Sequence, residues 1–104
     1  MSEPELNQVR IDVVLAELQP LRRTPAGVPV VNCLLAHQSQ QIEAAVKREV
    51  AVELQAVAVG ELANVLAVAA PGVKLRASGF LAAKSLRSRA PVLHLNKIEF
   101  LEGN

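Results

Sequence analysis

The chain has 104 residues, about half of them hydrophobic, which favours one folded domain with a core of modest size. Its formal net charge is only +1, and its single cysteine, Cys33, excludes an internal disulfide and a cysteine-rich metal site. Trp and Tyr are missing, and the only aromatic residues besides histidine are Phe80 and Phe100. Such a core must be aliphatic, and a site built on aromatic stacking is nearly excluded.

The N-terminus is polar and acidic, which argues against a signal peptide. No hydrophobic run reaches the roughly twenty residues needed to span a bilayer. A lone, buried thiol also fits a reducing compartment. We therefore expect a cytoplasmic chain that does not contact a membrane. It should form one domain over residues 1–104, with a flexible lead at 1–7 and a tail at 102–104.

Period-two alternation predicts a strand that begins at Val9 and is ended by Pro20 and the Arg22-Arg23 pair. Its buried face would consist of Val9, Ile11, Val13 and Leu15. The next segment, residues 24–29, predicts a turn, because Pro25 presets φ and Gly27 can adopt a positive φ. Hydrophobic strands on both sides of this turn indicate a hairpin.

The second strand is predicted over residues 28–38, where Cys33 has the position of a small core residue rather than a nucleophile. His37 lies near the end of this strand, at a structural or rim position. Residues 39–45 are polar and predict a loop. Residues 46–59 then give the longest strand pattern, and a strand of this length is expected to bend and to serve two surfaces.

A short helix is predicted over residues 61–70, where the hydrophobic period changes from two to that of a helix. Pro71-Gly72 ends it. Its buried face would consist of Leu62, Val65, Leu66 and Ala69.

Two further strands follow the helix. The fourth begins at Val73, and Gly79 within it permits a bulge or a close approach of another backbone. Pro91 opens the fifth strand, and its hydrophobic residues change parity after Leu95. That change predicts a bulge near Asn96-Lys97.

Charge is segregated along the chain. Residues 1–61 contain five bases and eight acids, whereas residues 62–104 contain six bases and two acids. Three of the bases lie in the loop before the fifth strand: Lys84, Arg87 and Arg89. A local positive field on a nearly neutral domain suits a polyanion, although a solvated hairpin tip is the simpler interpretation.

No catalytic site is predicted. His37 and His94 are the only imidazoles, and neither belongs to a recognisable triad motif. No Gly-rich phosphate loop follows a strand and opens a helix, and the carboxylates form no acid–base pattern. We expect a chain that is not an enzyme and that has no cofactor and no metal.

Five strands with a helix between the third and the fourth is the order of the OB fold, an all-β barrel that often binds oligonucleotides. Over residues 8–101 the chain also resembles the family of primosomal replication protein N (PriB), bacterial relatives of the single-stranded DNA-binding protein. The resemblance is carried by the order and spacing of Thr24-Pro25-Ala26-Gly27-Val28-Pro29, Leu35-Ala36-His37-Gln38-Ser39, Gly79-Phe80, Leu93-His94 and Lys97-Ile98-Glu99.

The resemblance implies a homodimeric OB-fold protein that binds single-stranded DNA and helps the restart helicase of the primosome to rebuild a replication fork. Family members contact DNA through the faces of the strands and through the basic loop between the fourth and fifth strands. The positions of this sequence that match are Gln38, Lys47, Arg48, Ala51, Lys84, Arg87 and Arg89.

The chain departs from the family pattern at several of these positions. Val46 and Ala51 stand where the family has aromatics, Gln38 replaces an Arg, and the loop before Pro91 is shorter. Proteins hold a single strand with a positive groove and aromatic platforms, and this chain has the first device but lacks the second. The alternative is a primosome adaptor whose basic loop mainly contacts a protein partner and which binds DNA weakly.

The sequence also predicts a homodimer. A small OB barrel has exposed edge strands, which need to be paired or covered. Val14 and Ala16 lie on the opposite face of the first strand from Val13 and Leu15, so this strand is hydrophobic on both sides over part of its length.

Overall fold

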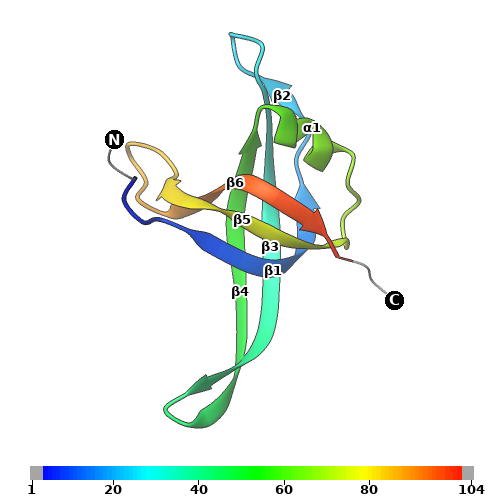
Figure 1. Ribbon diagram of the computed structural model, residues 1–104. Coiled ribbons are helices and arrows are strands. Elements are labelled where there is room, and N and C mark those ends of the chain that lie inside the picture. Colours follow the sequence, from blue (N-terminus) through cyan, green and yellow to red (C-terminus); the bar gives the residue numbers. More distant parts are fainter. Residues whose placement is uncertain (1–3, 102–104) are drawn as a thin grey trace.

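A computed structural model describes residues 4–101, so parts of the expected lead and the whole tail lie outside the described residues. Six strands and one helix make up the fold (Figure 1). In chain order they are β1 (Val9–Leu18), β2 (Arg22–Arg23), β3 (Pro29–Glu43), β4 (Val46–Val59), α1 (Glu61–Ala67), β5 (Lys74–Ala83) and β6 (Pro91–Phe100).

The strands form one sheet that closes on itself. Neighbours follow the order β1-β5-β6-β4-β3-β2, and β1 pairs with β3 as well, which joins the two sides of the sheet. Strands β1, β3, β4, β5 and β6 therefore make a five-stranded barrel, while β2 adds two residues at the edge of β3. The pairing of β4 with β6 is parallel and all the others are antiparallel. This is the predicted OB fold, with its helix between the third and fourth strands of the barrel.

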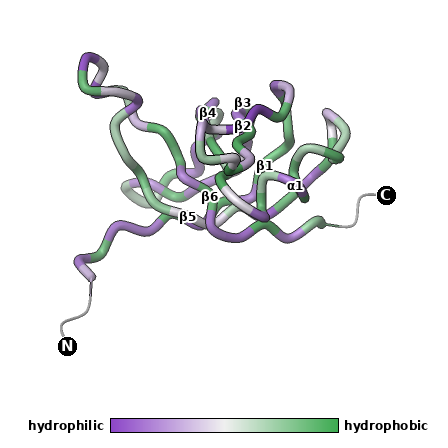
Figure 2. The backbone as a smooth tube through the Cα atoms, turned by 90° about the horizontal axis from the view of Figure 1, so that it is seen from above, coloured by the Kyte–Doolittle hydropathy of each residue, from purple (hydrophilic) through white to green (hydrophobic). Residues whose placement is uncertain are grey.

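The barrel interior is aliphatic, as expected. Alternate residues of each strand point inward, and Figure 2 shows hydrophobic and hydrophilic positions interleaved along the strands. Helix α1 adds Ala63 and Leu66, which are fully buried, whereas Val65 is exposed. The predicted helical face was therefore wrong at Val65. The helix has only seven residues, and its buried face is formed by Ala63 and Leu66 rather than by Val65. In the part of the chain that is described, no helix has the length and hydropathy to span a membrane.

Cys33 lies in this core on β3 and is 2% exposed. Burial raises the pKa of its thiol to about 11, since the thiolate would lose its hydration. The thiol is therefore neutral at physiological pH, in agreement with its predicted role as a small core residue.

Strands β3 and β4 continue beyond the barrel as a two-stranded arm, residues 38–51, which points downward in Figure 1. Their pairing is unbroken from the barrel to Glu43 and Val46. The turn consists of Ala44 and Ala45 alone, with φ of 51° and 65°, the positive values typical of a two-residue hairpin turn. The loop predicted over 39–45 was wrong, because the polarity of these residues reflects a ribbon exposed on both faces.

The bulge predicted near Asn96 is confirmed. The register of β5 against β6 shifts between Ser78 and Gly79, and this leaves Asn96 as the extra residue of β6. A Cβ atom at Gly79 would lie 2.0 Å from the carbonyl oxygen of His94, so only glycine allows this approach. One consequence is that Phe80 pairs directly with His94.

Candidate nucleic-acid interface

A groove lies on the outer surface of the barrel, between the β2–β3 turn and the loop that joins β5 to β6. Its floor is formed by Val30, Val57 and Val92, which are at most 8% exposed although they point away from the barrel interior. Its volume is about 370 Å³. The other residues that line it are Arg22, Thr24, Asn32, Gln55, Val59, Ala83, Lys84 and His94.

The groove combines an apolar floor with a cationic rim. Among the described residues that line it, Arg22 and Lys84 are cationic and none is acidic. Arg22 Nη2 donates a hydrogen bond of 3.2 Å to Asn32 Oδ1, and Gln55 adds a second amide. This arrangement fits an elongated ligand that carries both negative charges and flat apolar surfaces.

One wall of the groove is the turn that the sequence predicted after β2. The backbone nitrogen of Gly27 donates to the carbonyl oxygen of Thr24 at 2.8 Å, and the nitrogen of Val28 donates to Thr24 Oγ1 at 3.1 Å. Gly27 has φ of 87°, which agrees with the role expected for it. Arg23 Nη1 also donates to the Gly27 carbonyl oxygen at 3.1 Å, so the turn is held by its own polar groups.

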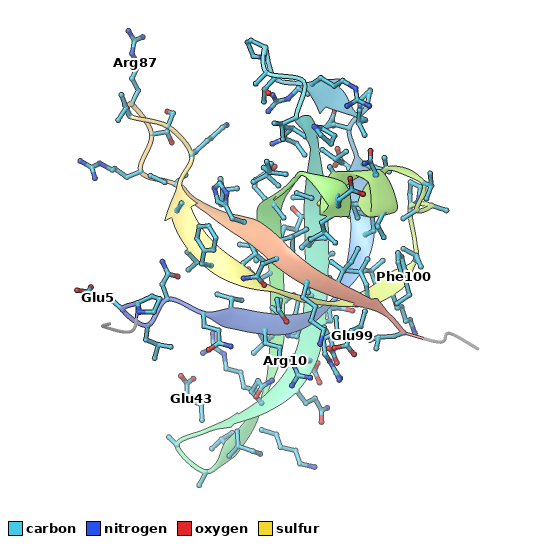
Figure 3. All side chains as sticks on the ribbon, turned by 45° about the horizontal axis from the view of Figure 1, so that its top comes forward. Glu5, Arg10, Glu43, Arg87, Glu99 and Phe100 are labelled. Atoms are coloured by element: carbon cyan, nitrogen blue, oxygen red, sulfur yellow. The ribbon has the colours of Figure 1, made fainter. Side chains whose placement is uncertain are left out.

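The other wall is the basic loop, residues 84–90. Lys84 N donates to the carbonyl oxygen of Ala90 at 2.8 Å and closes the loop at its base. Ser85 Oγ accepts from the backbone nitrogens of Arg87 and Ser88 at 3.2 and 3.0 Å. Because the backbone is tied to itself, the cationic side chains extend into solvent, and Arg87 points away from the barrel in Figure 3.

The cations of the basic loop differ from other cations of the C-terminal half. Arg76 holds Asp12 with two hydrogen bonds of 2.5 and 2.9 Å, and Lys97 lies 3.4 Å from Glu99. Within residues 4–101, by contrast, no carboxylate forms an ion pair with a cation of the basic loop. The positive charge that the sequence segregates is therefore available at the groove.

The candidate residues of β3 and β4 lie on the arm. Gln38 pairs with Ala51, and both point to the side of the sheet that also forms the groove floor. Lys47 shares this side, because it is four residues from Ala51 on the same strand. Arg48 has the opposite parity and is bound to Glu43 at 2.7 Å, so the structure does not bring it together with the others.

The charge of the arm differs from that of the basic loop. Glu49 and Glu53 flank Ala51 on the same side of β4. Glu49 Oε1 accepts a hydrogen bond of 2.7 Å from Gln40 Nε2, and Glu53 lines a hollow of about 350 Å³ together with Ala51. This part of the surface therefore carries one cation, Lys47, against two carboxylates.

Sequence reasoning missed several residues of the groove. They come from β2, β3, β4, β6 and the turn, so no local motif unites them. For those on β3, β4 and β6 the available signal was parity, since each of them alternates with core residues. The missed residues are Arg22, Thr24, Asn32, Gln55 and His94.

The barrel and its cationic groove define an OB-fold protein of the oligonucleotide-binding type. Residues 7–97 match a family described as "Another single-strand binding protein family". The wild-type single-stranded DNA-binding protein from Thermus aquaticus has the same fold, with a TM-score of 0.76 and 25% sequence identity over 94% of this chain and 51% of that chain.

More similar proteins narrow this class. The replication restart protein PriB of Bordetella pertussis is 34% identical over 99 residues, which are 95% of this chain and 92% of that protein. The PriB of Neisseria meningitidis serogroup A is 36% identical over 93% of this chain and 96% of its own length. A PriB structure from Ralstonia solanacearum has a TM-score of 0.87 at 39% identity and covers 94% of this chain and 100% of that chain. The chain belongs to the PriB family, as its resemblance predicted.

Proposed function

We propose that this chain binds single-stranded DNA during replication restart, with the phosphates held by the basic loop and the strand lying in the groove. The observation that carries this proposal is the groove itself, with its apolar floor and its rim of Arg22 and Lys84. Arg87 and Arg89, which form no ion pair with any carboxylate of residues 4–101, extend the positive field from the rim. Membership of the PriB family supports a role in replication restart. We further propose that the protein assists the restart helicase of the primosome.

Binding of this kind does not read sequence. Phosphate contacts from Lys and Arg position the strand, and an apolar floor accepts any base. The amides of Asn32 and Gln55 can hydrogen-bond to sugar or base edges without enforcing one sequence. No step of this function requires a catalytic group or a cofactor.

The test is fluorescence anisotropy with a labelled oligo(dT) at low salt. Binding that weakens when the three loop cations are replaced by alanine, in a variant that remains folded by circular dichroism, supports the proposal. A folded triple variant with unchanged affinity contradicts it.

The second part of the proposal is a homodimer formed through β1. This strand pairs with β5 over residues 9–14 but with β3 only over residues 14–18, which leaves one edge of residues 9–13 without a neighbouring strand in the described chain. His37 Nδ1 donates to the Asp12 carbonyl oxygen on this edge at 2.7 Å. Exposed edges of this kind are commonly paired with another chain. Sedimentation at micromolar concentration should give the mass of two chains, and a monomer there contradicts the proposal.

A second candidate function is that of a protein-interaction adaptor. Leu86 is fully exposed at the tip of the basic loop, between Lys84 and Arg87. Phosphate binding does not use this side chain, whereas a partner with an acidic, apolar surface would. Leu86→Ser should then weaken capture of the restart helicase and leave oligo(dT) affinity unchanged. A Leu86→Ser variant that loses both helicase capture and oligo(dT) binding, or that loses neither, contradicts the adaptor function.

A further inference from the structure

The surface of the groove continues past its rim onto two more strands. The strand registers place Asn32 beside Val57, Val57 beside His94, and His94 beside Phe80. These residues therefore form one row across β3, β4, β6 and β5, with steps of about 4.8 Å between neighbouring strands. The row begins in the groove and ends at Phe80.

Phe80 and His94 stand against each other at the end of this row. Their ring centroids are 5.1 Å apart and their planes differ by 11°, which is a stacked arrangement. Phe80 is nevertheless 42% exposed, so a large aromatic surface remains in contact with solvent. The register shift at Gly79 is what sets the two residues opposite each other.

The two rings face different hollows. His94 lines the groove, whereas Phe80 lines a second hollow of about 560 Å³ together with residues 4–8. Asn7 holds that N-terminal segment beside β5, because its side chain exchanges hydrogen bonds of 2.8 and 2.9 Å with the backbone of Leu81. The stacked pair is therefore the wall between the groove and this second hollow.

We propose that the Phe80–His94 pair is a base-stacking platform, over which a single strand passes from the groove across β6 and onto β5. An unpaired base adds to the stack as a further flat ring, and this contact accepts every base because each has a π-face. The proposal rests on the proposed function, since the groove and the basic loop deliver the strand to the platform. It adds an aromatic element that the composition alone had nearly excluded, because Phe80 gains its partner only through the fold.

The chain supplies a matched control. Phe100 is the other phenylalanine and is 49% exposed, similar to Phe80. It lies at the far end of β6 from the basic loop, as Figure 3 shows. Phe100→Leu therefore removes a ring of similar exposure that the proposed path does not reach.

The experiment compares oligo(dT) with an abasic oligonucleotide of the same length, by anisotropy at one fixed salt concentration. The parent protein should bind oligo(dT) more tightly, because the abasic strand keeps the phosphates but has no bases. Phe80→Leu should weaken oligo(dT) binding about 5- to 150-fold, while its affinity for the abasic strand changes less than about twofold. Phe100→Leu should leave both affinities unchanged, and Phe80→Trp should retain oligo(dT) binding.

Three results would overturn the platform. They are equal affinity of the parent for the two oligonucleotides, an unchanged oligo(dT) affinity in Phe80→Leu, and an equal loss on both oligonucleotides in Phe80→Leu. The first needs no variant, so it can overturn the platform even where Phe80→Leu does not fold. If the parent binds neither oligonucleotide at low salt, the proposed function fails together with the platform. Equal binding of both overturns the platform alone.

Discussion

The groove and the arm belong to the same side of the β3–β4 sheet, but their charges differ. The groove has Arg22 and Lys84 on its rim and, among its described lining residues, no carboxylate. On the arm, Glu49 and Glu53 flank Ala51 and outnumber Lys47. One continuous surface therefore has a cationic end at the groove and a predominantly acidic end on the arm.

For phosphate binding, we expect the existing ion pairs to matter more than the number of bases. Arg48 and Arg76 carry the same positive charge as Arg87, but Arg48 is held by the Glu43 carboxylate and Arg76 by the Asp12 carboxylate. A cation that already has a partner offers less to a phosphate, because the existing pair must first be broken or shared. We therefore assign phosphate binding to the basic loop rather than to the arm.

The largest effect is expected from removing the charges of the basic loop. A variant with Lys84, Arg87 and Arg89 replaced by alanine should bind oligo(dT) roughly a hundredfold more weakly at low salt, at about 1 kcal/mol for each lost contact. The matched control replaces Lys47 and Arg48 on the arm by alanine, and anisotropy should give a change of less than about fivefold. A larger loss of oligo(dT) affinity in the arm variant than in the loop variant would assign phosphate binding to the arm.

The arm lacks an aromatic side chain at Ala51, and a substitution can supply one. Ala51 is exposed, so Ala51→Trp introduces a large ring without a clash in the core. If DNA passes along this face, the ring should add about 1–3 kcal/mol of binding free energy through stacking, as measured with oligo(dT). The salt dependence should stay the same, because no phosphate contact is added. No gain in a folded variant would mean that the strand does not pass over Ala51.

The smallest effect is expected from releasing a cation that lies outside the groove. Asp12→Asn releases Arg76 and raises the net charge by one, yet oligo(dT) affinity should change less than about twofold, since the pair lies away from the groove. A clear gain in affinity would show that net charge, rather than its position, governs binding.

The folding stability of Asp12→Asn should also depend on pH differently from that of the parent. The hydrogen bond from Arg76 lowers the pKa of Asp12 below its usual value, so the ionised carboxylate stabilises the folded state. That contribution is present above the unfolded pKa of about 3.9 and is lost as the pH falls through the lower, folded value. Thermal unfolding of the parent and Asp12→Asn should therefore differ slightly at pH 7 and converge below pH 3 or so. A difference that persists at low pH would exclude this origin.

Much of the fold could be predicted because it is encoded locally. The turn at Gly27, the end of β4 at Gly60 and the bulge at Gly79 each depend on a residue type with a known backbone preference. The arm could not be predicted in this way. Its turn uses Ala44 and Ala45 at positive φ, without the Asn-Gly signal that such turns usually carry.

The site was predictable only in part. The charges of the basic loop are adjacent in sequence, so their loop was visible from the residues alone. The groove depends instead on which strands become neighbours, and the parallel pairing of β4 with β6 is what brings Val57 beside His94. The Phe80–His94 stack needs the pairing of β5 with β6 and the bulge between them, which is why neither residue was singled out as part of an interface.

The most direct test of phosphate binding by the basic loop is the salt dependence of oligo(dT) affinity in the parent and in the variant lacking its three cations. On a single strand, the logarithm of the binding constant falls with the logarithm of the salt concentration by about 0.7 for each phosphate contacted. We predict a steep slope for the parent and a slope shallower by about 2 for the variant, with Lys47→Ala changing it by less than about 0.7. Equal slopes for the parent and the loop variant would contradict the account.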